Sequence, residues 1–170
     1  SDLNEFSDCI QRAVQGLAHK TGFKVKNLQV GMGGGLVAVR ESGAVIPLLD
    51  HGNKVINNQD VKKVKQQARL LGIQLEEEIL HDFPKYFKVD DVNTAVNPVG
   101  LYGRKLGANF LLVITNLTRM RNIAKAVNQA GFELGQVYFS SYAASQVALD
   151  KKARTDGAAF VDVGSTSTAV

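Results

Sequence analysis

The sequence predicts an α/β fold, and three observations support this prediction. Apolar residues at three- and four-residue spacing, typical of helices, recur between stretches of strict alternation, which are typical of half-buried strands. The first half of the chain mixes the two kinds of element irregularly and so predicts an α+β module. The second half alternates strand, helix, strand, helix, strand (βαβαβ), which predicts a mainly parallel sheet covered on both faces.

The composition is that of an ordinary globular protein, with 170 residues, 45% of them hydrophobic and 21% charged. A chain of this length can bury a core without a disulfide or a metal. Cys9 is the only cysteine, which excludes a disulfide framework, and its helical spacing from Phe6 and Ala13 predicts a small core residue. No apolar run reaches the roughly 18 residues of a membrane-spanning helix, and no signal peptide is expected.

The chain begins with a predicted helix, capped by Asp2 and ended near Gly22. Its apolar residues recur at helical spacing: Phe6, Ile10, Ala13, Val14 and Leu17. Alternation over residues 25–32 then predicts a strand, which the triple glycine at 33–35 ends in a tight hairpin or bulge. Because a valine-rich strand follows these glycines, where a phosphate-binding P-loop needs a helix, they do not predict a P-loop.

Residues 36–48 predict a second strand, bent at Ser42-Gly43. A helix follows, capped by residues 57–60 and closed by Gly72. Its predicted inner face is formed by Val61, Val64, Ala68 and Leu71. Residues 79–89 alternate again, and Pro84 within them predicts an edge strand or a bulge, because proline cannot donate to a strand ladder.

A turn cluster with one proline and two glycines spans residues 97–103 and leads into a strand. The core of this strand, residues 110–114, is apolar on both sides, which predicts that both of its faces are covered. The remaining predicted elements follow in order: a helix that begins at Asn116 or Thr118 and ends at Gly131, a strand over 136–140, a helix over 141–150 and a strand over 158–164.

The end of the chain, "FVDVGSTSTAV" (160–170), predicts a strand that runs into a polar turn. Gly164 lets the backbone approach phosphate oxygens, and successive N–H groups can form an anion-binding concavity. Asp162 could orient a water held by Mg²⁺. The further donors of this candidate site are Ser165, Thr166, Ser167 and Thr168. The alternative is a polar turn without a ligand.

A stretch without acidic residues lies between Asp91 and Glu133. It contains five basic residues, Arg104, Lys105, Arg119, Arg121 and Lys125. One interpretation is a solvated helix face, and the other is a surface for an acidic protein partner or anionic lipid headgroups. Nucleic acid is a weaker interpretation, because no aromatic residues are interleaved with the basic ones as stacking platforms.

Two stretches of the sequence resemble known proteins. "GFELGQVYFSSYAASQVALDKKARTDGAAFVDVGSTSTAV" resembles the centre of actin-like ATPases, and "ILHDFPKYFKVDDVNTAVNPVGLYGRKL" is similar to the FtsA family of bacterial cell-division proteins, whose members carry an inserted module called 1C or SHS2. "NNQDVKKVKQQARLL" also fits that module. The resemblance implies three regions: the inserted subdomain over 1–115, part of subdomain 1A over 116–156, and the start of subdomain 2A over 157–170.

The resemblance implies a scaffold that binds ATP with Mg²⁺, polymerises, links FtsZ filaments to the cytoplasmic face of the membrane at the division site and recruits other division proteins. In such proteins two hairpins hold the phosphates. We expect the first hairpin before residue 1 and the return strand of the second after Val170. The chain is thus expected to be a central fragment that lacks the membrane helix, does not bind nucleotide by itself and has no activity. The intact protein is expected to be at most a weak ATPase.

The sequence departs from the family pattern at the phosphate turn. Ser165 and Thr166 stand where the family has glycines, and Ala169 stands where it often has aspartate, so weaker nucleotide binding is expected. Two alternatives stay open: a pilus-assembly actin-like scaffold, against which the Asn97–Gly100 turn argues, and a phosphotransferase of the sugar-kinase or acetate-kinase type. The latter needs a catalytic acid or base and a substrate pocket, and the sequence indicates neither.

No other pattern predicts catalysis. His19, His51 and His81 lack metal-ligand spacing, and Ser140 and Ser141 are expected to cap the helix that follows them.

Overall fold

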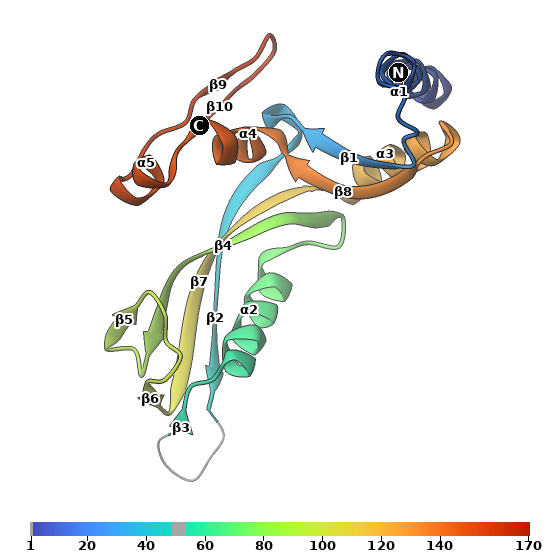
Figure 1. The fold of residues 1–170 in the computed structure, drawn as a ribbon. Coiled ribbons are helices and arrows are strands. Elements are labelled where there is room, and N and C mark those ends of the chain that lie inside the picture. Colours follow the sequence, from blue (N-terminus) through green and yellow to red (C-terminus); the bar gives the residue numbers. More distant parts are fainter. Residues whose placement is uncertain (1, 49–53) are drawn as a thin grey trace. The chain divides into compact units, whose positions relative to one another are not determined.

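The computed structural model describes residues 2–48 and 54–170. Its helices and strands are mixed along the whole chain, which confirms the predicted α/β class (Figure 1). The chain divides into two compact units. One unit is Ala38–Ile114, and the other combines the chain up to Val37 with Thr115–Val170.

The unit over 38–114 is built on a four-stranded sheet with the order β2-β7-β4-β5. These strands span Ala38–Pro47, Lys105–Asn116, Glu77–Val89 and Asn93–Ala95. β2 and β7 pair in antiparallel fashion from Ala38 opposite Ile114 to Pro47 opposite Lys105. The register is unbroken throughout, so the bend predicted at Ser42-Gly43 introduces no bulge.

Helix α2 spans Asn58–Gly72 and packs against β2. Its start is the predicted cap: the side chain of Asn57 accepts from the backbone N–H of Asp60 at 3.1 Å, and Asp60 accepts in return from the N–H of Asn57 at 3.0 Å. Gly72 is the last helical residue, and close packing explains its identity. A Cβ there would lie 2.6 Å from the Cβ of Ser42 and would overlap Leu112.

The core of this unit lies between α2 and the sheet. It consists of Ala44, Leu48, Ile56, Val64, Ala68, Ile79, Phe87, Val89, Leu106, Ala108, Phe110, Leu112 and Ile114. β7 has buried residues on both faces, as predicted, because Leu112 and Val113 are both buried. Leu71 was predicted to face inward but is 65% exposed, since it flanks Gly72 at the edge of the helix where the sheet does not cover it.

β4 carries Pro84, as an edge strand can. The short strand β5 pairs with β4 only at Phe87–Val89, so no described strand lies on that side of Pro84. His81 is half-buried and stacks on Phe83 with 5.8 Å between the ring centroids, and burial lowers its pKa. Two further short strands, β3 (Lys54–Val55) and β6 (Tyr102–Gly103), pair with each other.

The other unit begins with α1, Leu3–Thr21, which Asp2 caps and which ends at Gly22, both as predicted; Gly22 adopts the left-handed conformation. α1 packs against α3, Leu117–Gln129. The least exposed residues of α1 are Leu3, Ser7, Ile10, Val14 and Ala18. The predicted core position of Cys9 is therefore wrong: Cys9 is exposed, as are Phe6, Ala13 and Leu17, because they lie off the stripe that faces α3.

β1 (Asn27–Met32) pairs in parallel with β8 (Glu133–Phe139). The triple glycine does not form the expected hairpin, because β1 and β2 belong to different sheets and a short 3₁₀ turn, η1 (Gly34–Leu36), lies between them. The parallel sheet predicted for the second half is likewise reduced to β1 and β8, since β7 pairs with β2 instead.

The last elements are α4 (Ser140–Ala148), α5 (Lys151–Asp156), β9 (Asp162–Val163) and β10 (Thr168–Ala169). α5 was not predicted, although Asp150 caps it by accepting from the N–H of Ala153 at 2.7 Å. The compact units also differ from the predicted subdomains before residue 38, because α1 packs against α3 and β1 pairs with β8. The subdomain names themselves stay a prediction.

Candidate functional site

The predicted phosphate turn is a closed hairpin. Thr168 lies opposite Val163 and Ala169 opposite Asp162, and the N–H of Gly164 donates to the carbonyl oxygen of Ser167 at 2.9 Å. A Cβ on Gly164 would itself lie 2.9 Å from that oxygen, so this turn requires glycine. The expectation that the return strand lies beyond Val170 is wrong, because β10 already starts it.

The carboxylate of Asp162 is held from the first turn of α4. Ser141 is buried, and its hydroxyl donates to Oδ2 of Asp162 at 2.6 Å. The predicted capping role of Ser140 and Ser141 is wrong, since the cap position is Phe139 and no side chain caps the helix there. Ser140 instead donates to the carbonyl oxygen of Met32 at 2.9 Å. The two serines thus connect α4 to β9 and to β1.

The glycine turn η1 lies against this hairpin. A Cβ on Gly34 would be 3.1 Å from the Cβ of Ala169, and a Cβ on Gly35 would be 3.8 Å from that of Ser167. The triple glycine and the hairpin are more than 120 residues apart in the sequence, so their contact was not predicted. The only local signal of their contact is that small residues occupy both sides.

The hydroxyl residues of the hairpin differ in exposure. Ser165, Thr166 and Thr168 are exposed, whereas Ser167 is half-buried beside η1. The two side chains that replace family glycines therefore stand at the open tip of the turn. Backbone N–H groups at such a turn can hold an anion, and the exposed hydroxyls can add donors.

The turn that carries the family resemblance has its own hydrogen bonds. The side chain of Asn97 accepts from the N–H of Val99 at 3.1 Å, and Gly100 adopts φ +93°. The N–H of Gly100 donates to the carbonyl oxygen of Ile56 at 2.9 Å, and the N–H of Ile56 donates to that of Leu101 at 2.9 Å. The asparagine, the glycine and the adjoining strand β3 therefore fix this turn together.

Comparison of the sequence with known proteins finds similarity to one family. Residues 34–114 match the family described as the SHS2 domain inserted in FtsA. The cell-division protein FtsA of Borreliella burgdorferi is 29% identical over 161 residues, which are 95% of this chain and 39% of that protein. FtsA of Bacillus subtilis is 27% identical over 169 residues, 99% of the chain and 38% of the protein. FtsA of Escherichia coli K12 is 25% identical over 164 residues, 96% of the chain and 38% of the protein.

This chain is similar to FtsA over nearly its whole length.

The chain spans about two-fifths of the length of these curated FtsA relatives. The matched SHS2 region ends at Ile114, the residue that also ends the compact unit over Ala38–Ile114. The region that matches the SHS2 domain, here called the SHS2 unit, is therefore a separate structural unit with its own core.

The five basic residues predicted as a partner surface divide between the two units of the FtsA-like chain. Arg119, Arg121 and Lys125 are exposed on α3. Arg104 and Lys105 lie in the SHS2 unit, where the carboxylate of Asp90 accepts from their backbone N–H groups at 2.8 and 2.9 Å and Asp91 pairs with the ammonium of Lys105. These two N–H groups lower the pKa of Asp90. Asp90 and Asp91 thus lie beside Arg104 and Lys105 in the fold, although they precede the stretch without acidic residues.

Within residues 2–48 and 54–170, no group of three His, Cys, Asp or Glu side chains could hold a metal ion. No helix of this described part is long and apolar enough to cross a membrane.

Proposed function

We propose that this FtsA-like chain acts in bacterial cell division as a protein-docking part of a scaffold. Its similarity to FtsA over nearly its whole length carries the proposal, together with the match of residues 34–114 to the SHS2 domain. In this proposal the scaffold polymerises, links FtsZ filaments to the inner face of the membrane and recruits other division proteins. The basic residues of α3, Arg119, Arg121 and Lys125, contact an acidic protein partner.

ATP with Mg²⁺ is the cofactor that we propose for the scaffold. The hairpin fits such a group in one respect, because Gly164 leaves the backbone free of a Cβ at the turn. Asp162 would face the ion through water, and the N–H groups and hydroxyls of Ser165–Thr168 would hold phosphate oxygens. Bound Mg²⁺ would neutralise phosphate charge. The chain contributes one hairpin of the two that the resemblance implies, so we propose that it neither holds ATP tightly nor catalyses a reaction.

Co-purification tests the docking role. The tagged chain is recovered from cells of its source, and the proteins bound to it are identified by mass spectrometry. The proposal expects other division proteins among them. It also expects that Arg121→Glu combined with Lys125→Glu lowers their recovery, whereas Lys151→Glu combined with Lys152→Glu, which reverses exposed charges on α5, does not. Recovery of no division protein, or equal recovery with both double variants, would contradict the proposed docking through α3.

A further inference from the structure

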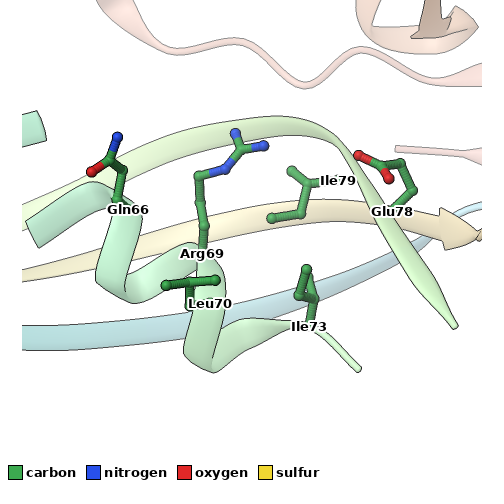
Figure 2. Close-up of a pocket in the computed structure, with 6 residues that line it drawn as sticks. All are labelled: Gln66, Arg69, Leu70, Ile73, Glu78 and Ile79. Carbon is green, nitrogen blue, oxygen red and sulfur yellow. The ribbon is translucent and has the colours of Figure 1, made fainter. Parts of the chain in front are cut away.

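The SHS2 unit has an open groove of about 400 Å³ between α2 and β4 (Figure 2). Its lining residues are Gln66, Arg69, Leu70, Ile73, Glu78 and Ile79. Figure 2 shows Ile79 pointing from β4 toward α2, with Leu70 and Ile73 on the helix side. Leu70 is 69% exposed although it lines the groove, so the described chain leaves an apolar wall open to solvent.

A firmly held turn over residues 73–76 connects α2 to β4 and so forms one end of this groove. The carboxylate of Glu77 accepts from the N–H of Gln74 at 2.9 Å, and the N–H of Glu77 donates to the carbonyl oxygen of Gln74 at 3.1 Å. The guanidinium of Arg40 donates to both oxygens of that carboxylate, at 2.6 and 2.8 Å, and to the carbonyl oxygen of Gly72 at 2.8 Å. These hydrogen bonds fix the turn from both sides.

Leu75 is a central residue of this turn and is 98% exposed. It lies two residues after Ile73, so the Cα atoms of these two residues are at most about 7 Å apart. Leu75 therefore adds to the apolar wall at this end of the groove. Because the backbone that carries it is already held in place, a partner that covers Leu75 would lose little free energy in ordering the turn.

The two ends of the groove carry opposite charges. Two lysines lie at one end and two glutamates at the other: Lys62 and Lys63, and Glu76 and Glu78. The lysines precede Gln66 by four and three residues, so they extend the same helix face, and the glutamates lie beside Leu75 and Ile79 in the sequence. Within the described residues, none of these four side chains is in an ion pair of the chain. Between the ends, Asp82 pairs with Lys65 and Arg69 and offsets part of their charge.

The strand that borders the groove is already engaged, so a partner gains little from pairing its backbone with β4 there. The N–H of Glu77 donates within the turn, and His81 stacks on Phe83 with 5.8 Å between the ring centroids. A helix satisfies its backbone hydrogen bonds internally and needs only side-chain contacts. The groove therefore favours a helical partner over an extended one.

We propose that this groove binds an amphipathic helix of a partner protein. Its apolar face covers Leu70 and Leu75 and places one side chain in the hollow beside Ile79. Its first turn is acidic and lies by the two lysines, and its last turn is basic and lies by the two glutamates, an arrangement that the dipole of the bound helix also favours. The inference rests on the proposed docking role and names the surface and the chemistry of one partner.

Helix α1 of a second copy fits this groove less well. It also has an acidic residue in its first turn and basic residues in its last turn. Between Phe6 and Leu17, however, its exposed stripe consists of Cys9, Ala13 and Gly16. These small residues would leave much of a groove of about 400 Å³ unfilled.

The probe is a fluorescent peptide of about 18 residues, because shorter helices are marginal in water. It has glutamates in its first turn, lysines in its last turn, leucines at three- and four-residue spacing, and alanine and glutamine elsewhere. A second peptide has the same composition with its leucines spread around the helix, and a third has alternating valine and threonine between the same charged ends. Fluorescence anisotropy with the 170-residue chain should show saturable binding of the first peptide and about tenfold or greater loss of affinity for the other two.

Two matched pairs of variants test the apolar contact. Leu70→Ser and Leu71→Ser change leucines of α2 that are 69% and 65% exposed, but only Leu70 lines the groove. Leu75→Ser and Val96→Ser change residues that are 98% and 97% exposed. Val96 adjoins the turn that bonds Ile56, near the start of α2, and this 15-residue helix is about 22 Å long. Leu70→Ser and Leu75→Ser should each weaken binding of the first peptide by about fivefold or more, and the two controls by less than about twofold.

A charge exchange tests the orientation of the bound helix. Glu76→Lys combined with Glu78→Lys should weaken binding of the first peptide and strengthen binding of a peptide whose last-turn lysines are replaced by glutamates. Because each peptide is compared between two proteins, its own helix content cancels. The variant should reverse the ranking of these two peptides.

Four results would overturn the inference: equal affinity for the first two peptides, equal affinity for the valine–threonine peptide, equal effects within either matched pair, or an unchanged ranking in the charge variant. Self-association of the chain that Leu70→Ser abolishes, detected by sedimentation, would assign the groove to a second copy and would also overturn it. A chain that recovers division proteins but does not distinguish the peptides retains the proposed function and loses only this inference. A chain that distinguishes them but recovers no division protein retains the groove and loses the proposed function.

Discussion

The hydroxyl of buried Ser141 donates to the carboxylate of Asp162 at 2.6 Å, which joins the start of α4 to the first strand of the β9–β10 hairpin. This bond fixes Asp162, the one acidic side chain of the candidate phosphate site. It also gives a buried serine a structural role that its position at a helix start did not predict.

Ser141→Ala should lower the free energy of unfolding by about 1.5 kcal/mol, because a hydrogen bond to a charged acceptor is lost. Urea unfolding followed by circular dichroism measures this change. Ser145→Ala is the matched control in the same helix, where the hydroxyl only bonds the carbonyl oxygen of Tyr142 at 2.7 Å. That substitution should change stability by less than about 0.5 kcal/mol. Equal effects of the two substitutions would show that the bond to Asp162 adds no stability.

Gly34→Ala should displace the hairpin, because the new Cβ would lie 3.1 Å from the Cβ of Ala169. The measurement is the change in backbone amide chemical shifts at Ser167–Ala169. Gly33→Ala is the control, since a Cβ at Gly33 meets nothing within 4 Å and its φ of −74° suits alanine. Shifts as small for Gly34→Ala as for Gly33→Ala would contradict the close approach of η1 to the hairpin.

Gly72→Ala and Gly16→Ala should have opposite effects on stability. At Gly72 the added methyl group overlaps Leu112 and Ser42, so unfolding should become easier by about 1–3 kcal/mol. At Gly16, inside α1, a Cβ meets nothing within 4 Å, and alanine should stabilise the protein by roughly 0.5–1 kcal/mol. Thermal unfolding of both variants tests the pair, and stabilisation by Gly72→Ala would refute the tight contact between α2 and the sheet.

Asp60 should make stability depend on pH in the acid range. Burial alone would raise the pKa of its carboxyl, but the N–H of Asn57 and the ammonium of Lys54 outweigh burial and lower the pKa from its ordinary value of 3.8. Because the folded pKa lies below the unfolded one, this contribution is fully present above about pH 3.8 and is lost as pH falls through the folded pKa.

Asp60→Asn should therefore lower the free energy of unfolding at pH 6 by about 1 kcal/mol or more and reduce its decrease at acid pH. Glu77 and Asp90 also have lowered pKa values, and they should retain part of the pH dependence. Unfolding measured at pH 6 and pH 3 for both proteins checks this prediction. An unchanged acid dependence in the variant would mean that Asp60 does not contribute.

Sequence patterns predicted the local features well. The caps at Asp2, Asn57 and Asn116, the helix end at Gly22 and the left-handed Gly131 depend on residues close in the sequence, so short stretches specify them. The covered strand at 110–114 was also predicted, because a strand that is apolar on both faces is expected to be buried on both faces.

Features that depend on distant partners were harder to predict. The exposed faces of α1 and α2 could not be distinguished from buried ones, because Phe6 and Leu71 continue an apolar pattern that no neighbour covers. The candidate site shows the same limit. Its glycine and hydroxyl residues were identified from sequence, but Ser141 and Gly34 were not, because strand pairing and helix packing bring them to the hairpin.

Calorimetric titration of the chain with ATP and Mg²⁺ tests the central claim most directly, namely that this chain supplies one side of a nucleotide clamp and a docking unit. The account predicts no saturable heat up to about 1 mM ATP, because one hairpin alone offers few of the contacts that tight binding requires. Saturable binding with a Kd in the micromolar range would contradict it, because the described hairpin would then belong to a complete nucleotide site.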